Sequence, residues 1–176
     1  SYKFFHKNCE FNIPLEIEKL YELFENIEPG SKVKLKKFMK QARIKYELSM
    51  QNFIRLPNNS IKEYISFPLI KNMFSLDLLK SLRKHISYYF QNKVLRDLLE
   101  FPSMFLGGSP NNTPALYTLM NYADIALGTW YPIGGMRKVS DGFLKLSKEL
   151  GVRHILNQEI VNFKIKNNEI INAVTS

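Results

Sequence analysis

Apolar side chains recur every three or four residues from Ile17 to Phe53, and this spacing most constrains how the chain folds. Pro29 and Gly30 interrupt the pattern, because proline cannot continue a helix and glycine favours the turn that follows one. The sequence therefore predicts a helix from Ile17 to Ile27 and a long amphipathic helix from about Ser31. Their predicted apolar faces are Ile17, Leu20, Tyr21, Phe24 and Ile27, and Leu35, Phe38, Met39, Ala42, Tyr46 and Phe53.

The segments on either side of this helix pair follow two different patterns. Tyr2 to Ile13 carries apolar patches without helical spacing and is closed by Pro14, which favours two short strands. Ser60-Ile61-Lys62-Glu63 has the form of a capping box and predicts the start of another helix. The next apolar stripes predict a mostly helical middle; they are Leu79, Leu82, Ile86, Tyr89 and Phe90, then Val94, Leu95, Leu98 and Leu99.

Helix signals return in the last third of the chain. Asn112-Thr113-Pro114 predicts a helix from Ala115 to Ile125 that ends at Gly128. Trp130 and Tyr131 are aromatic residues that favour the end of a strand, and Gly134-Gly135 predicts a turn directly after it.

A helix and a hairpin are predicted after that turn. The helix carries Val139, Phe143, Leu146 and Leu150 at helical spacing and ends at Gly151. The apolar alternation from Val161 to Ile165, the pair Asn167-Asn168 and the apolar run Ile170–Val174 predict a β-hairpin with a tight turn.

The formal net charge of +9 is concentrated in the segment from Lys32 to Lys45. A solvated helix face explains such a run, and it is favoured over a dedicated anion-binding surface on pattern alone. No apolar run reaches the length that spans a bilayer. The single Cys9 excludes an internal disulfide and favours a reducing compartment.

Common catalytic and ligand motifs are missing from the sequence. His6, His85 and His154 lie far apart without further ligands at metal-binding spacing, so no metal site is predicted. Neither a G-x-G-x-x-G nor a Walker motif is present, no G-x-S-x-G surrounds a serine, and no base neighbours Cys9. The aromatic and methionine residues between Phe101 and Met136 form either ordinary core or the lining of an apolar cavity.

From Phe101 onward, five spaced motifs resemble the bacterial type of the phytoene desaturase family, flavoproteins of the amine-oxidase-like group. In order they are S-M-x-L-G-G-S-P from Ser103, P-A-x-Y-x-L-M from Pro114, G-x-W-Y-P-x-G-G-M from Gly128, L-x-x-E-L-G-V from Leu146 and L-N-x-x-I-x-x-F from Leu156. The resemblance weakens upstream of Phe101.

The resemblance implies an α+β fold, with a mostly helical substrate-binding domain and short strands, as a fragment of a two-domain FAD-dependent oxidoreductase. Residues 1–133 would be the substrate-binding, membrane-facing domain, and residues 134–176 the helix and strands that return to the FAD-binding domain. The family's Rossmann motif and its second flavin-contacting motif are absent, so we expect the chain by itself to be inactive.

The resemblance also suggests site residues. The residue matching Ile160 meets the adenine of FAD through its backbone in the family, and the segment matching Gly128 to Tyr131 lies beside the reactive face of the flavin. An apolar tunnel for the substrate would be lined by Phe105, Tyr117, Trp130 and Tyr131, although each of these is equally typical of a core. Ile133 departs from many relatives, which carry a polar or basic residue there.

The implied reaction removes hydrogen from a phytoene-like carotenoid precursor, with a hydride passing to FAD and a proton leaving the adjacent carbon. No catalytic base is assigned, because capping already explains Glu63 beside Lys62. For an enzyme that takes its substrate from a bilayer, the basic segment from Lys32 to Lys45 suggests contact with an anionic membrane surface. We expect a cytoplasmic location, peripheral on the inner face of the membrane, and no nucleic-acid partner.

Two alternatives stay open. The chain could come from a carotenoid isomerase or a retinol-saturase-like relative in the same group. It could also be a basic, non-catalytic module that binds a membrane or an acidic partner.

Overall fold

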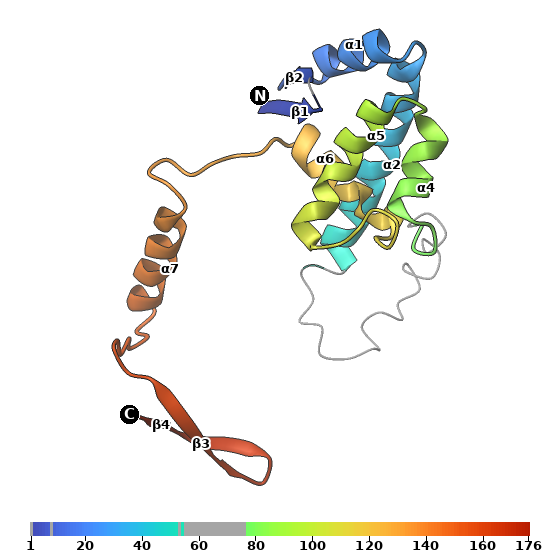
Figure 1. Cartoon of the computed structure of the whole chain (residues 1–176). Coiled ribbons are helices and arrows are strands. Elements are labelled where there is room, and N and C mark those ends of the chain that lie inside the picture. The colour runs from blue at the N-terminus through green and yellow to red at the C-terminus, as the bar shows by residue number, and fades with distance from the viewer. Residues whose placement is uncertain (1, 8, 53, 55–76) are drawn as a thin grey trace. The chain divides into compact units, whose positions relative to one another are not determined.

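The computed structural model describes residues 2–7, 9–52, 54 and 77–176. It divides into two compact units, Ser1–Thr129 and Trp130–Ser176, which we call the helical unit and the hairpin unit (Figure 1). The predicted capping box at residues 60–63 lies outside the described residues. The predicted division between residues 133 and 134, which concerned an FAD-binding domain, stays a prediction.

The helical unit begins with the two short strands that the sequence predicts. β1 (Tyr2–His6) pairs antiparallel with β2 (Cys9–Ile13). Two side chains tie β1 to later helices: the Tyr2 hydroxyl donates to Asp124 Oδ2 at 3.1 Å, and His6 Nε2 lies 2.8 Å from Asp97 Oδ2. Burial, and then the charge of Asp124, raise the pKa of Tyr2.

Two helices follow, as the apolar spacing predicts. α1 (Ile17–Ile27) and α2 (Ser31–Asn52) are joined by a turn in which Gly30 has a φ of +84°. The carboxylate of Glu25 accepts hydrogen bonds from the main-chain N–H groups of Gly30 and Lys32, at 2.7 and 2.8 Å. A side chain near the end of α1 therefore satisfies donors at the start of α2, where a helix leaves them unpaired.

The next described helices are α4 (Leu82–Tyr89) and α5 (Lys93–Glu100). Ser81 and Asn92 cap them, because their side-chain oxygens accept from the N–H groups of Lys84 and Val94. Leu79 lies before the Ser81 cap and is fully exposed, so the prediction that it belongs to the apolar stripe of this helix is wrong.

Two 3₁₀ turns complete the helical unit. η3 (Phe101–Leu106) ends at Gly107, which adopts the left-handed conformation with a φ of +66°. η4 (Ala115–Thr118) leads directly into α6 (Leu119–Ile125), so the predicted helix from Ala115 to Ile125 is present with a 3₁₀ first turn. The N–H of Ala115 donates to Lys80 O at 2.7 Å, which places η4 beside the start of α4.

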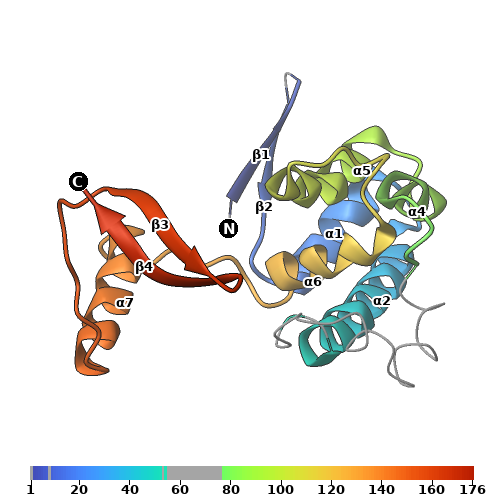
Figure 2. The same ribbon diagram turned by 90° about the horizontal axis from the view of Figure 1, so that it is seen from below.

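The core of the helical unit lies where α1, α2, α4 and α5 meet, and the two views show these helices gathered together (Figure 2). Phe24, Phe38 and Phe90 are fully buried, and the ring of Phe90 packs edge-on against both of the others. Each buried phenylalanine contributes about 1.5–3 kcal/mol of hydrophobic stabilisation.

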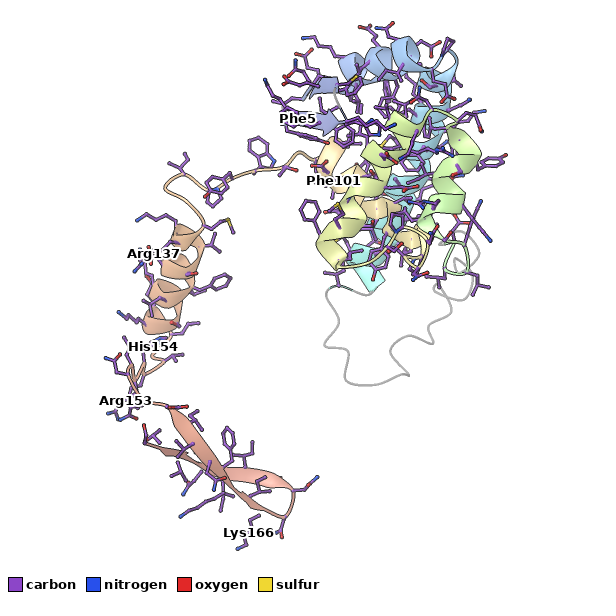
Figure 3. The ribbon with its side chains drawn as sticks, viewed as in Figure 1. Phe5, Phe101, Arg137, Arg153, His154 and Lys166 are labelled. Carbon is purple, nitrogen blue, oxygen red and sulfur yellow. The ribbon has the colours of Figure 1, made fainter. Side chains whose placement is uncertain are left out.

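The hairpin unit contains α7 (Arg137–Glu149), β3 (Ile160–Lys166) and β4 (Glu169–Thr175). α7 ends as predicted: the N–H groups of Gly151 and Val152 donate to Lys148 O and Ser147 O, the pattern of a glycine-terminated helix. Asn167 and Asn168 have φ values of +51° and +65° in the tight turn between the antiparallel strands. Side chains project from both faces of this hairpin, and Lys166 lies next to its turn (Figure 3).

The strand predicted at Trp130 and Tyr131 is wrong, because residues 128–132 form no strand. A β-strand needs a paired neighbour, and the described residues place none beside this segment. The remaining strands and helices make the mixed α+β fold that the sequence predicts. Among the described residues, no helix combines the length and the apolar character needed to cross a bilayer.

Candidate functional site

Lys45 lies on the buried face of α2, and its side chain is 0% exposed. Its Nζ donates to Ala115 O at 3.0 Å and to Thr118 Oγ1 at 3.3 Å, and it lies 2.9 Å from Asp77 Oδ2. Burial lowers the pKa of Lys45, while the hydrogen bond and charge of Asp77 oppose that shift. Three acceptors match the three donors of an ammonium group, so this buried charge is fully satisfied.

His85 of α4 borders this ion pair. Its Nδ1 lies 3.5 Å from Asp77 Oδ2, and its ring packs against the rings of Phe38 and Tyr89. Within the described part of the chain, neither ring nitrogen has a hydrogen-bond partner. Burial, and then the positive charge of Lys45, lower the pKa of His85 to about 4, so its imidazole is neutral at pH 7. We call the buried Lys45 and His85, together with the partly exposed Asp77, the buried polar cluster.

The predicted substrate residue Tyr117 lies on η4, the turn that Lys45 contacts. Ala115 and Thr118 are fully buried, whereas Leu116 and Tyr117 are partly exposed. Residues three apart share one face of a 3₁₀ helix, so Ala115 and Thr118 form the inner face that Lys45 contacts. The Thr118 hydroxyl also donates to Ala115 O at 2.9 Å, which closes this inner face. Tyr117 therefore lies on the outer side of a turn that is held from beneath.

The predicted substrate residue Phe105 lies on η3, in an exposed apolar group. Phe105 is 73% exposed, and its ring packs edge-on against that of Phe101, with the centroids 5.4 Å apart. The side chain of Pro102 is buried and anchors the turn. We call the exposed group the η3 patch; its members are Phe101, Met104, Phe105 and Leu106. Contiguous exposed apolar side chains of this kind mark contact surfaces for apolar partners.

The remaining predicted site residues lie in the hairpin unit. Trp130 and Tyr131 are 86% and 74% exposed and precede a turn closed by a 3.0 Å hydrogen bond from Gly135 N to Pro132 O. Gly134 and Gly135 have φ values of +85° and +88°, which confirms the predicted glycine turn. Ile160 begins β3 opposite Thr175, and its side chain is exposed.

The structure thus places Phe105 and Tyr117 on the helical unit, and Trp130, Tyr131 and Ile160 on the hairpin unit. Their roles toward substrate and cofactor stay predictions. Lys45, Asp77 and His85 were not predicted as site residues. One signal was present, since Lys45 follows Ala42 by three residues, at the spacing of the apolar face.

The basic segment from Lys32 to Lys45 is a solvent-facing surface only in part. Lys36, Lys37, Lys40 and Arg43 are exposed, and Lys36 Nζ lies 4.9 Å from the centre of the Tyr21 ring. Lys45 is buried, so its assignment to the exposed basic face is wrong. The reason is that its ammonium group finds acceptors inside the fold.

The three histidines are held in separate surroundings. His6 pairs with Asp97, His85 belongs to the buried polar cluster, and His154 Nε2 lies 2.7 Å from the Ser147 hydroxyl. In the ranges that the structure describes, no three His, Cys, Asp or Glu side chains are grouped as a metal site requires.

Comparison with known proteins finds no matching family model. Curated relatives do match. A carotenoid 3,4-desaturase of Haloarcula japonica is 28% identical over 158 residues, which cover 89% of this chain and 32% of the relative. A zeta-carotene-forming phytoene desaturase of Myxococcus xanthus is 30% identical over 129 residues, or 73% of this chain and 25% of the relative.

A 4,4'-diapophytoene desaturase of Staphylococcus aureus is 26% identical over 157 residues, or 89% of this chain and 31% of the relative. The chain spans about a quarter to a third of the length of these relatives. Over most of its length, the chain is therefore homologous to carotenoid and phytoene desaturases, which confirms the resemblance seen in its motifs.

Proposed function

We propose that this chain is part of a carotenoid desaturase-like oxidoreductase, and that it helps to hold a long isoprenoid hydrocarbon of the phytoene type. The observation that carries the proposal is similarity over 73–89% of the chain to desaturases named for three different carotenoid reactions. What those relatives share is a polyene substrate, which agrees with the exposed aromatic residues of this chain.

A hydrocarbon offers no hydrogen-bonding groups, so a protein binds it by apolar burial and shape alone. The η3 patch presents such a surface on the helical unit, and Trp130 and Tyr131 present another on the hairpin unit. In this proposal, Phe105, Tyr117, Trp130 and Tyr131 contact the polyene and exclude water from it. Contacts of this kind set the position of the chain without discriminating strongly between hydrocarbons that differ by one unit.

The proposed cofactor is FAD, which would accept a hydride from the hydrocarbon. Residues of this chain would supply only a small part of the FAD-binding site. Ile160 begins β3, which pairs with β4 along one edge, and in this proposal main-chain groups on the other edge would meet the adenine ring. A dinucleotide phosphate also needs a glycine-rich loop at a helix start, and this sequence contains no such motif. The phosphates would then be held by residues outside this chain, and we expect the chain alone to be inactive.

The proposal is tested with the protein encoded by the complete reading frame, called here the full-length protein. It would be produced in a bacterial host that accumulates phytoene or 4,4'-diapophytoene, and the pigments would be separated by chromatography. We expect carotenes with additional conjugated double bonds, and a yellow, FAD-containing protein after purification. Trp130→Ala should reduce the yield of product, while Leu79→Ala, at a fully exposed site, should not.

Two results would contradict the proposal. One is a full-length protein that neither contains nor takes up FAD. The other is conversion of a polyene to a geometric isomer without loss of hydrogen, which would favour the isomerase alternative.

A further inference from the structure

A lysine at a fully buried position needs an explanation, because an aliphatic side chain would fill the same space without the cost of removing an ammonium group from water. Lys45 contacts two segments far away in the sequence: η4, through Ala115 O and Thr118 Oγ1, and Asp77 just ahead of α4. Hydrogen bonds are directional, so they fix the orientation of a turn more narrowly than apolar packing does.

The contacts of Lys45 reach only the inner face of η4. Ala115 and Thr118 both touch its Nζ and are both fully buried, whereas the intervening Leu116 and Tyr117 lie off that face and are partly exposed. Because η4 is a single short turn, holding its inner face also determines where the Tyr117 ring lies on the outer face.

We propose that Lys45 is a positioning residue, whose buried ammonium group fixes the turn Ala115–Thr118 and thereby holds Tyr117 against the hydrocarbon substrate. This inference rests on the proposed function, because that function supplies the ligand of Tyr117. The role of Asp77 is to balance the charge of Lys45 at 2.9 Å, so that the ammonium group remains inside the fold.

The test is a double-mutant cycle in the full-length protein with Lys45→Met, Tyr117→Ala and the double variant, assayed with phytoene. Lys45→Met keeps the length of the side chain and removes its donors. We expect it to raise KM by about tenfold with a smaller change in kcat, since a misplaced contact weakens substrate positioning. In the Tyr117→Ala background, Lys45→Met should no longer change KM, because the side chain that it positions is gone.

Two variants serve as controls. Lys19→Met breaks a different ion pair of the helical unit, the exposed pair of Lys19 with Glu16 at 2.8 Å, and it should leave KM unchanged. Lys45→Arg keeps the charge and donors, so it should restore part of the loss. If Lys45→Met does not fold, Thr118→Val replaces it in the cycle, because at nearly constant shape it removes the hydroxyl that accepts from Lys45 and donates to Ala115 O.

A second measurement does not depend on activity. The protein would be labelled with 3-fluorotyrosine, and the fluorine resonance of Tyr117 assigned by its loss in Tyr117→Phe. We expect Lys45→Met to shift or broaden this resonance, and Lys19→Met to leave it unchanged. An unchanged resonance in Lys45→Met overturns the inference, as does an equal effect of Lys45→Met on KM with and without the Tyr117 ring. If the unmodified protein converts no polyene, the proposed function fails, and the fluorine spectrum alone decides whether Lys45 positions Tyr117.

Discussion

The side chain of Glu28, just after α1, accepts a 2.8 Å hydrogen bond from the main-chain N–H of Asn92, the residue that caps α5. The same carboxylate oxygen accepts the N–H of Gln91 at 2.9 Å, and the other oxygen accepts from Lys34 Nζ at 2.8 Å. One side chain therefore joins the ends of three helices. Burial alone would raise the pKa of Glu28, but the hydrogen bonds from Lys34, Asn92 and Gln91 lower it.

Glu28→Ala should destabilise the full-length protein by about 1–3 kcal/mol, because two main-chain donors lose a charged acceptor. Since the pKa is lowered in the folded state, the stabilisation is present above the ordinary carboxylate pKa and is lost as the pH falls through the folded value. Urea denaturation at pH 7 and at pH 3 would measure this. If Glu28→Ala lowers the free energy of unfolding by the same amount at both pH values, the explanation is wrong.

His85 should make the fold less stable in mild acid. Its folded-state pKa of about 4 lies below the ordinary value of 6.5, so the unfolded chain binds the proton first as the pH falls. The free energy of unfolding should therefore decrease between about pH 6.5 and pH 4, by an amount on the order of 1–3 kcal/mol. In His85→Phe, the free energy of unfolding should depend less steeply on pH in this range. If the slope is the same as in the unsubstituted protein, His85 is not the cause.

The two glycines Gly134 and Gly142 should respond in opposite directions to substitution by alanine. Gly134 has a φ of +85°, and an added Cβ would lie 3.1 Å from Lys138 Cγ, so Gly134→Ala should cost about 1 kcal/mol. Gly142 lies within α7 with open space around it, so Gly142→Ala should stabilise by about 0.5–1 kcal/mol. Hydrogen exchange of α7 amides in the full-length protein would compare them. Protection that changes in the same direction in both variants would contradict the prediction.

The exposed part of the basic segment provides a test of the proposed membrane contact. Reversing the charge at Lys36, Lys37 and Lys40 should weaken co-sedimentation with anionic liposomes by about tenfold or more, and should have no effect with neutral liposomes. Reversal at Lys148, Lys164 and Lys166, which are also exposed, is a control with the same change in net charge. Equal losses in the two triple variants would show that net charge, and no particular face, governs binding.

Local spacing was sufficient to predict most of the elements. The helices α1 and α2, the turn at Gly30 and the asparagine turn of the hairpin depend on residues close in sequence, so the pattern contains the information. The strand at Trp130 and Tyr131 failed because pairing is a tertiary property, which aromatic content alone does not determine.

The candidate site was predicted less well, for a related reason. Lys45 was assigned to the solvent because charged residues usually lie there. Its acceptors, Ala115 O and Thr118 Oγ1, come from a turn 70 or more residues further along the chain, and no local pattern links them. Phe105 and Tyr117 were proposed as substrate residues only through the family resemblance, because an exposed aromatic and a core aromatic look alike in one sequence, and their role stays a prediction.

The ion pair of Lys45 and Asp77 also has a consequence for how this sequence diverges. A neutral residue at position 45 would leave the Asp77 carboxylate without its cation, and a neutral residue at position 77 would leave the ammonium group buried beside one acceptor fewer. A single substitution at either position is therefore expected to destabilise the fold, and the two positions should change together during evolution. Among homologues aligned at these positions, an apolar residue matching Lys45 should be accompanied by the loss of the acid matching Asp77.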